Sequence, residues 1–246
     1  PHQASSVMRR ANLTLEPGQL LCVIGAAASG KSTFCRLVAG MLEPRSGKIR
    51  LGDIDVYRLQ QMSMDREISY LPQDITLFAG SVRDNISGMA DAEWDRVVEA
   101  AKLAGVHEAI LALPEGYDTI VSDREPLLSA GQRKGMALAR AFYDRPSVIV
   151  LDEPLPHLDH RLQRNLLSAL VFLKSKGCIV VMTSQHREVA KIADKVLVLD
   201  DGRPRLFDDR HDIDLLFRED GLEDSDNNVK RLGKRRRAKS DGLRSA

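Results

Sequence analysis

Apolar residues occur along this chain in short unbroken runs, separated by stretches in which they recur about every 3.6 residues. The runs at residues 20–24, 147–151 and 178–183 are typical of strands buried on both faces of a sheet. The stretches at residues 31–41 and 160–177 are typical of helices. Strands that alternate with helices predict an α/β fold with a mostly parallel sheet flanked by helices.

Two further patterns modify this core. Residues 13–25 read as strand, turn at Pro17-Gly18, and strand, and the turn pair Asp201-Gly202 predicts a strand pair near the end of the domain. An antiparallel β portion is therefore expected beside the parallel sheet, with further strands within 46–56 and 67–73. Residues 82–142 have a helical pattern and predict an inserted all-helical subdomain.

The chain is long and apolar enough to bury a full core, and its low aromatic content predicts an aliphatic one. No apolar run approaches the roughly 18 residues that a membrane-spanning helix requires. Because the chain begins with Pro1 and carries no signal-like segment, we expect a fragment of a longer protein. Cys22, Cys35 and Cys178 lack metal-ligand spacing, which favours reduced thiols in a cytosolic core.

Charge is unevenly distributed. Residues 230–246 contain eight Lys/Arg and one Asp, a net charge of +7, whereas the preceding residues contain 28 Lys/Arg and 34 Asp/Glu, a net charge of −6. We predict a folded domain at 1–218 and a disordered basic tail at 219–246. The tail could bind anionic lipid head groups, contact nucleic acid, or remain solvated without a partner.

A phosphate-binding motif follows the first buried run. Residues 25–33, GAAASGKST, fit the pattern G-x-x-x-x-G-K-[ST] between a predicted strand and a predicted helix, the context that the pattern requires. Backbone N–H groups of such a loop surround phosphates, and the helix N-terminus adds its positive end. Lys31 would reach the β- and γ-phosphates, and the Ser32 hydroxyl would coordinate Mg²⁺. The predicted nucleotide-binding residues of the loop are Gly25, Ala26, Ala27, Ala28, Ser29, Gly30, Lys31, Ser32 and Thr33.

An acidic pair ends a later strand. In VIVLDEP, four apolar residues precede Asp152, which can hold the water shell of a metal, and Glu153, which can orient and polarise an attacking water. Acidic residues at strand ends are common and indicate little alone. In one chain with the phosphate loop, the pair predicts nucleotide hydrolysis.

Residues 127–142, LLSAGQRKGMALARAF, are similar to the signature motif of the ATP-binding cassette (ABC) family, with Ala130 in place of the usual middle glycine. Gln73 matches the Q-loop of that family and Asp159 matches the D-loop aspartate. The similarity covers nearly all of residues 1–215. The matching signature residues are Leu128, Ser129, Ala130, Gly131 and Gln132.

This resemblance implies a P-loop NTPase core that works as a pair. In the family, two such domains sandwich two ATP molecules, and the signature loop of one domain caps the γ-phosphate held by the other. Ser129 and the backbone at Gly131 would supply donors there, at a helix N-terminus that favours an anion. The implied ligands of Mg²⁺ are Ser32, Gln73 and Asp152.

The flanking segments 70–86 and 113–146 resemble the exporter branch, and within it most resemble the ATPase halves of bacterial type I secretion systems. That resemblance implies a transmembrane domain in the same full-length chain, at the cytoplasmic face of the bacterial inner membrane. Membrane-fusion and outer-membrane proteins are further candidate partners, and no nucleic acid is expected. Residues 1–24 contain no Phe, Tyr or Trp, so we expect the family's adenine-stacking aromatic residue upstream of Pro1.

The family's switch histidine leaves two candidates here. Alignment from Gly177 forward and from Asp194 backward both put that position at Gln185, one residue before His186. In an extended segment a slip of one residue points a side chain to the opposite face, although a local bulge could return His186 to the phosphate. Gln185 could still hydrogen-bond a phosphate, but it carries no charge. Both residues, and a solvated His186, remain open.

Two departures from the family pattern leave a second function open. Pro156 stands where the exporter D-loop usually has a small polar residue, and proline removes an N–H group. Residues 122–126, SDREP, replace the usual glycines before the signature. The chain is therefore predicted to be an ABC-type ATPase, with a degenerate ATP-binding regulatory cassette as the alternative. A soluble cassette ATPase acting on nucleic acid or ribosomes is disfavoured, because such proteins usually carry two cassettes in one chain.

Overall fold

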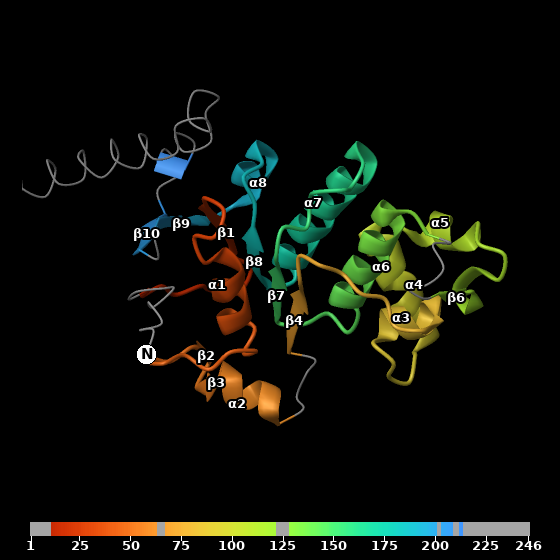
Figure 1. Ribbon diagram of the computed structural model, residues 1–246, viewed down its shortest axis with the longest axis horizontal. Helices are drawn as coiled ribbons and strands as arrows, with labels where there is room; N and C mark the ends of the chain where they lie inside the picture. The colour runs from red at the N-terminus through yellow and green to blue at the C-terminus, as the bar shows by residue number, and fades with distance from the viewer. Residues whose placement is uncertain (1–10, 63–66, 122–127, 201–202, 209–211, 214–246) are drawn as a thin grey trace, which may run out of the picture.

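A mostly parallel sheet lies at the centre of the computed structural model, which describes residues 11–62, 67–121, 128–200, 203–208 and 212–213 (Figure 1). Within these residues the sheet has six strands in the order β10-β9-β1-β8-β7-β4. β9, β1, β8, β7 and β4 run parallel, and β10 pairs antiparallel with β9 at one edge. The strands are β1 (Leu20–Gly25), β4 (Ile68–Leu71), β7 (Val148–Leu151), β8 (Ile179–Thr183), β9 (Lys195–Asp200) and β10 (Arg203–Phe207).

The unbroken apolar runs arise because both faces of this sheet are covered. Successive side chains of a strand point to opposite faces. Leu20 and Cys22 accordingly belong to the large core, which also contains residues of α7 (His160–Ser175), while Leu21 and Val23 belong to a second core with residues of α1 (Lys31–Val38). A third helix, α8 (Arg187–Ile192), follows β8 and contacts α7 and β1.

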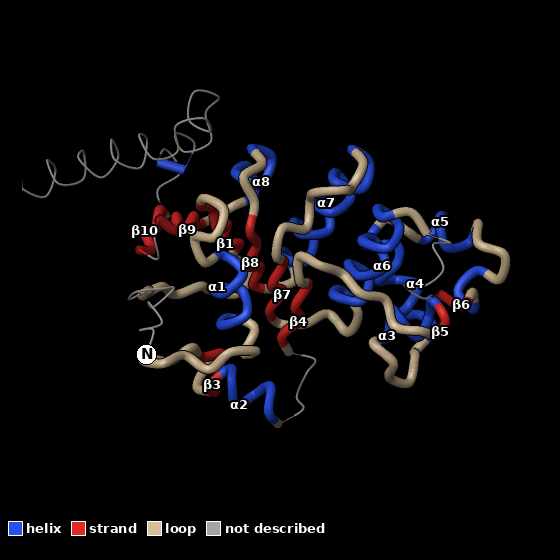
Figure 2. Tube along the Cα trace, in the orientation of Figure 1, coloured by secondary structure: helices blue, strands red, loops and turns tan. Residues whose placement is uncertain are grey.

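A small antiparallel unit follows α1. β2 (Arg50–Leu51) pairs with β3 (Ile54–Asp55), and α2 (Val56–Gln61) begins directly afterwards. The Asp55 carboxylate caps α2 by accepting hydrogen bonds from the backbone N–H groups of Tyr57 and Arg58. The strand material expected within 46–56 is therefore present as a short hairpin beside α1 (Figure 2).

The helical lobe, residues 80–121 and 128–142, projects from the β4 edge of the sheet (Figure 1). Within it α6 (Ala130–Phe142) packs against α3 (Val82–Ser87) and α4 (Trp94–Ala104), and the two-residue strands β5 (Gly80–Ser81) and β6 (Ile120–Val121) pair. The prediction of an all-helical subdomain is thus right for most of this span and wrong at Ile120–Val121. Its helices are α3 (Val82–Ser87), α4 (Trp94–Ala104), α5 (His107–Leu111), the 3₁₀ helix η1 (Gly116–Asp118) and α6 (Ala130–Phe142).

Packing inside the lobe is close. Gly135 of α6 faces Val106 so tightly that a Cβ atom there would lie 2.1 Å from Val106 Cγ1. Trp94, at the start of α4, makes an edge-on contact with Tyr117, with ring centroids 5.0 Å apart. Tyr117 also shares a 2.8 Å hydrogen bond with His107 Nδ1. The lobe and one face of the sheet share the large core, so the lobe is fixed to the sheet by packing.

Three expectations differ from the structure or fall outside it. Residues 11–16 form no strand among the described residues; Leu13 and Leu15 alternate because they pack on the second core. α1 ends at Val38, three residues before Met41, because Gly40 adopts a φ of 72° that ends the helix. The tail at 219–246 lies outside the described residues. In the part of the chain that the structure describes, no helix combines the length and apolarity needed to cross a membrane.

Candidate nucleotide-binding site

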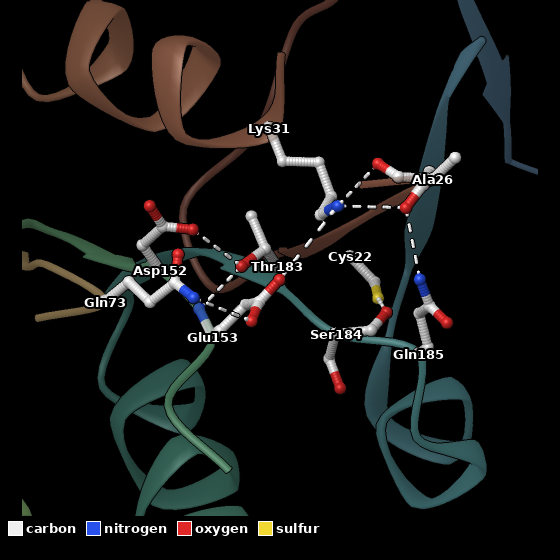
Figure 3. A network of polar contacts seen from close by, with 10 residues as sticks. Cys22, Ala26, Lys31, Gln73, Asp152, Glu153, Thr183, Ser184 and Gln185 are labelled. Carbon is white, nitrogen blue, oxygen red and sulfur yellow. Dashed lines mark hydrogen bonds and ion pairs between the residues drawn. The ribbon is translucent and has the colours of Figure 1, made fainter. Parts of the chain in front are cut away.

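Four parallel strands deliver the predicted site residues to one edge of the sheet. The 25–30 loop follows β1, Asp152 and Glu153 follow β7, Gln185 comes two residues after β8, and Gln73 comes two residues after β4. Because these strands are parallel neighbours, their carboxyl ends meet, and the side chains come from both sides of β8 into one polar network (Figure 3).

The 25–30 loop requires glycine at its first position. A Cβ atom on Gly25 would lie 2.4 Å from the Leu199 carbonyl oxygen and 2.5 Å from Ser29 Oγ. Ala28 and Gly30 both adopt left-handed conformations, with φ of 61° and 99°, which turn the chain sharply into α1. The backbone N–H groups at the start of α1 therefore follow directly on a tight loop, as an anion site requires.

Ser29, Ser32 and Thr33 place three hydroxyl groups on or beside this loop, and all three residues are half-buried. Ser29 Oγ is buried and has no hydrogen-bond partner among the described residues. A buried hydroxyl without a partner is costly in free energy. Ser29 thus has an unused donor in the predicted phosphate loop, in which Ala26 and Ala27 are exposed.

Lys31 folds back over the loop. Its ammonium donates hydrogen bonds to the carbonyl oxygens of Gly25 and Ala26, both at 2.9 Å, and lies 4.0 Å from Glu153 Oε1. The flexible side chain can rotate from these neutral carbonyls to a doubly charged phosphate, which attracts an ammonium more strongly.

A buried threonine organises the acidic pair. Thr183, at the end of β8, is fully buried and donates a 3.0 Å hydrogen bond to Asp152 Oδ1. The same hydroxyl accepts a 2.6 Å hydrogen bond from the backbone N–H of Glu153. Thr183 is not among the residues predicted from the sequence, where its signal is a polar residue that ends the apolar run IVVM. Asp152 is 1% exposed, so this hydrogen bond satisfies one oxygen of a carboxylate that burial would otherwise penalise.

Glu153 projects from a strained turn into the network. Its φ of 49° is unusual for a residue with a side chain and turns the backbone away from β7. The carboxylate lies between Lys31, 4.0 Å from Oε1, and Gln73, whose Nε2 is 3.4 Å from Oε2 (Figure 3). The Glu153 carboxylate therefore has an amide donor on one side and an ammonium on the other, next to the phosphate loop.

Gln185 and His186 differ in whether the side chain contacts the phosphate loop. Gln185 Nε2 donates a 3.1 Å hydrogen bond to the carbonyl oxygen of Gly25, so this side chain reaches the phosphate loop. His186 is the N-cap of α8, its backbone N–H donates to Ser184 Oγ at 3.1 Å, and the residue is exposed. No side-chain hydrogen bond of His186 is present among the described contacts. The geometry brings Gln185, and not His186, to the predicted site.

The signature residues are placed apart from the loop. Ser129 caps α6: its hydroxyl accepts from Gln132 N at 3.1 Å, and its N–H donates to Gln132 Oε1 at 2.8 Å. Ser129 and Ala130 are exposed, whereas Leu128 is buried beneath them. In Figure 1 α6 lies on the far side of β7 and β4 from α1, so the two halves of the predicted site do not meet within one chain.

The D-loop lies against the signature helix. Asp159 caps α7 by accepting a 2.8 Å hydrogen bond from Leu162 N. Gly131 approaches this loop so closely that a Cβ atom there would lie 3.3 Å from the His157 carbonyl oxygen. Residues 122–126 lie outside the described residues.

The comparisons with known proteins agree with this geometry. A family model described as ABC transporter matches residues 8–156. The chain is 38% identical over 84% of its length to the type I secretion system ATP-binding protein PrsD of Rhizobium meliloti, and covers 36% of that protein. It is 36% identical over 81% of its length to the cyclolysin secretion/processing ATP-binding protein CyaB of Bordetella pertussis, and covers 28% of that protein.

A solved structure of a bacterial Atm1-family ABC exporter with ATP bound aligns with a TM-score of 0.78 and 27% identity. The alignment covers 96% of this chain and 40% of that one. The chain belongs to the ABC transporter family, as an ATP-binding domain of the exporter type, and members of this family are ATPases coupled to transport. It spans about a third of the length of the secretion relatives it matches.

Proposed function

We propose that this chain binds and hydrolyses ATP, and that two copies close around two ATP molecules to drive export. The observation that carries the proposal is the Glu153 carboxylate, which lies between Lys31 and Gln73 and beside the buried Asp152–Thr183 pair. A carboxylate fixed next to a phosphate-binding lysine can accept a proton from a water that attacks a phosphate.

In this proposal each residue has one task. The backbone of residues 25–33 and Lys31 hold the phosphates of ATP. Glu153 orients and polarises the attacking water, which forms a bond to the γ-phosphorus while the bond to ADP breaks. Gln73 and the Thr183 hydroxyl keep Glu153 and its backbone in place, because each is hydrogen-bonded to it.

The residues predicted to hold Mg²⁺ fit that ion. Mg²⁺ prefers oxygen ligands and retains several waters. Ser32 offers a hydroxyl, Gln73 can offer its amide oxygen because its nitrogen faces Glu153, and Asp152 has a second oxygen beside the one bonded to Thr183. When bound, the ion would neutralise charge on the phosphates.

We assign the switch position to Gln185. Its amide already reaches the carbonyl of Gly25, which also accepts from Lys31, and a small rotation would bring the amide to a phosphate oxygen. His186 begins α8 with its backbone committed to Ser184. A neutral amide can donate to the phosphate but cannot add positive charge.

Dimerisation would complete the site. The exposed N-terminus of α6, with Ser129 and Gly131, offers donors and a positive helix end to a γ-phosphate held by a second copy. Asp159 and the D-loop would lie at the same interface. A symmetric pair then contains two equivalent sites, each formed by both chains.

The relatives support a proposal for the transport process. PrsD and CyaB are secretion ATP-binding proteins, which supports type I protein secretion as the process powered here. The partners would be a transmembrane domain at the cytoplasmic face of the bacterial inner membrane and, beyond it, membrane-fusion and outer-membrane proteins.

The proposal is tested by the steady-state ATPase rate as a function of protein concentration, for the wild type and Glu153→Gln. We expect a rate that rises more than linearly with concentration and falls by at least about 100-fold in Glu153→Gln, with ATP affinity retained. ATP binding without turnover above the Glu153→Gln background would instead support a regulatory cassette, which the neutral Gln185 and the missing N–H of Pro156 favour.

A further inference from the structure

Lys134 is a buried cation in the middle of the signature helix. It belongs to α6 and is 5% exposed, whereas lysines are almost never buried without partners. Its ammonium donates two hydrogen bonds to backbone carbonyl oxygens of another segment, to Glu153 at 2.8 Å and to Pro156 at 3.1 Å. One side chain of α6 therefore holds the turn that carries the predicted catalytic glutamate.

That turn is strained and would not hold its shape alone. Glu153 and His157 both have positive φ, 49° and 68°, and neither is a glycine. Non-glycine residues adopt this conformation only where surrounding contacts enforce it. The two carbonyls that Lys134 binds belong to the first strained residue and to the residue directly before the second.

The charge of Lys134 matters as well as its donors. Burial lowers the pKa of Lys134, and the nearby carboxylates of Glu153 and Asp152 act against this by favouring the charged form. A hydrogen bond from a charged donor is shorter and stronger than one from a neutral donor. A neutral side chain of similar size would leave two carbonyl oxygens with a weaker partner or with none.

α6 also contacts the same segment one turn earlier. Gly131 precedes Lys134 by three residues and so lies on the same face of the helix. The space left by its missing Cβ is filled by the His157 carbonyl oxygen. The face of α6 that includes Gly131 and Lys134 thus contacts residues 153–157. The exposed N-terminus of the same helix carries Ser129.

We propose that Lys134 is a positioning residue that couples the N-terminus of α6 to the turn at residues 153–157. When the N-terminus of α6 meets the nucleotide of a partner copy, Lys134 passes the displacement of α6 to Glu153 of its own chain. The proposal rests on the hydrolytic dimer proposed above. It assigns Lys134 no contact with ATP, only control over the turn from which Glu153 projects.

The test compares Lys134→Met, which removes charge and donors, with Lys134→Gln, which keeps an amide donor without charge. Lys102→Met, an exposed lysine on the neighbouring α4, is the matched control. We expect kcat to fall by about tenfold or more in Lys134→Met, less in Lys134→Gln and not in Lys102→Met, with KM for ATP within about twofold throughout.

A second readout does not depend on turnover. Amide hydrogen exchange across residues 152–159, measured without nucleotide, should be faster in Lys134→Met than in the wild type and in Lys102→Met, while exchange across α1 stays the same. Unchanged exchange in 152–159, or faster exchange with an unchanged kcat, overturns the proposal. A wild type that hydrolyses no more ATP than Glu153→Gln contradicts the proposed function instead, and the exchange experiment still decides whether Lys134 holds the turn.

Discussion

The carboxyl end of the sheet, which is called the sheet edge here, and the N-terminus of α6 both present polar residues. The two regions differ in how far these residues are buried and in what they bond to. At the sheet edge, Asp152 and Thr183 are buried and bonded to each other, and their network extends to Glu153. At α6, the side chains of Ser129 and Gln132 each bond to the other residue's backbone N–H group in a capping box near the surface. In the proposed function the first region would hold the groups that act on ATP within one chain, and the second would meet the nucleotide held by a second copy.

The largest effect should come from mixing two inactive variants that each lose one region. Lys31→Ala removes the phosphate lysine, and Ser129→Arg blocks the α6 N-terminus; each alone should lose at least about 100-fold in ATPase rate. An equal mixture should recover roughly a quarter of the wild-type rate, because half of the dimers then contain one intact site out of two.

The matched control adds Glu153→Gln to one copy at a time. In the Ser129→Arg copy, which supplies the intact phosphate loop, it should abolish the recovery; in the Lys31→Ala copy it should not. Equal effects in both, or no recovery despite demonstrated heterodimers, would show that the two regions do not form a shared site.

The next largest effect is expected at the buried Asp152–Thr183 pair. Thr183→Val removes the hydroxyl that serves Asp152 and the Glu153 N–H, leaving buried groups without partners. We expect the free energy of unfolding to fall by about 1–3 kcal/mol in urea titrations, with a lower kcat. Thr183→Ser keeps the hydroxyl and should recover most of both quantities. Ser129→Ala, the counterpart on α6, should cost only about 1 kcal/mol as a lost helix cap.

A smaller effect distinguishes the two switch candidates. Gln185→Ala should lower kcat by about tenfold, because an amide donor to the phosphate is lost, whereas His186→Ala should change it by less than about twofold. Steady-state rates at saturating ATP measure both. A collapse in His186→Ala alone would mean that the α8 N-terminus rearranges when nucleotide binds.

The smallest effect is expected from modifying the cysteines. Burial raises the pKa of Cys22 to about 12 and that of Cys178 to about 11, and it also raises the pKa of Cys35. Thiolate, the reactive form, is therefore scarce at pH 8.5, where an ordinary thiol is about half ionised. Iodoacetamide at that pH should leave mass and ATPase rate unchanged. Because folding keeps these protons bound, stability should decrease as the pH rises from about 8.5 toward 11.

How much the sequence revealed depended on how local each feature was. Residues 25–33 and the pair Asp152–Glu153 are contiguous, and their flanking apolar runs fixed their place at strand ends. The parallel sheet followed from the same runs, and the family followed from the resemblance of residues 127–142 to its signature motif; both are confirmed, the sheet by the fold and the family by the comparisons.

Features made by distant segments were not predictable in this way. Thr183 and Lys134 reach the 152–156 turn from β8 and α6, and nothing in their own neighbourhoods indicates that partner. The strand expected before the Pro17-Gly18 turn does not form at residues 11–16, where Leu13 and Leu15 pack on a core; such packing produces the same period as pairing in a sheet. Which of Gln185 and His186 reaches the phosphate loop depends on the path of the chain after β8, which the sequence does not show.

The single tryptophan of this chain lies in the helical lobe, where Trp94 rests edge-on against Tyr117 and is 51% exposed. Its fluorescence therefore reports on the lobe alone, while the far-ultraviolet circular dichroism signal reports on the secondary structure of the whole chain. When both signals are recorded during a denaturant titration, they compare the unfolding of the lobe with that of the whole domain. Coincident transitions mean that lobe and sheet unfold as one unit, and an earlier fluorescence transition means that the lobe unfolds first.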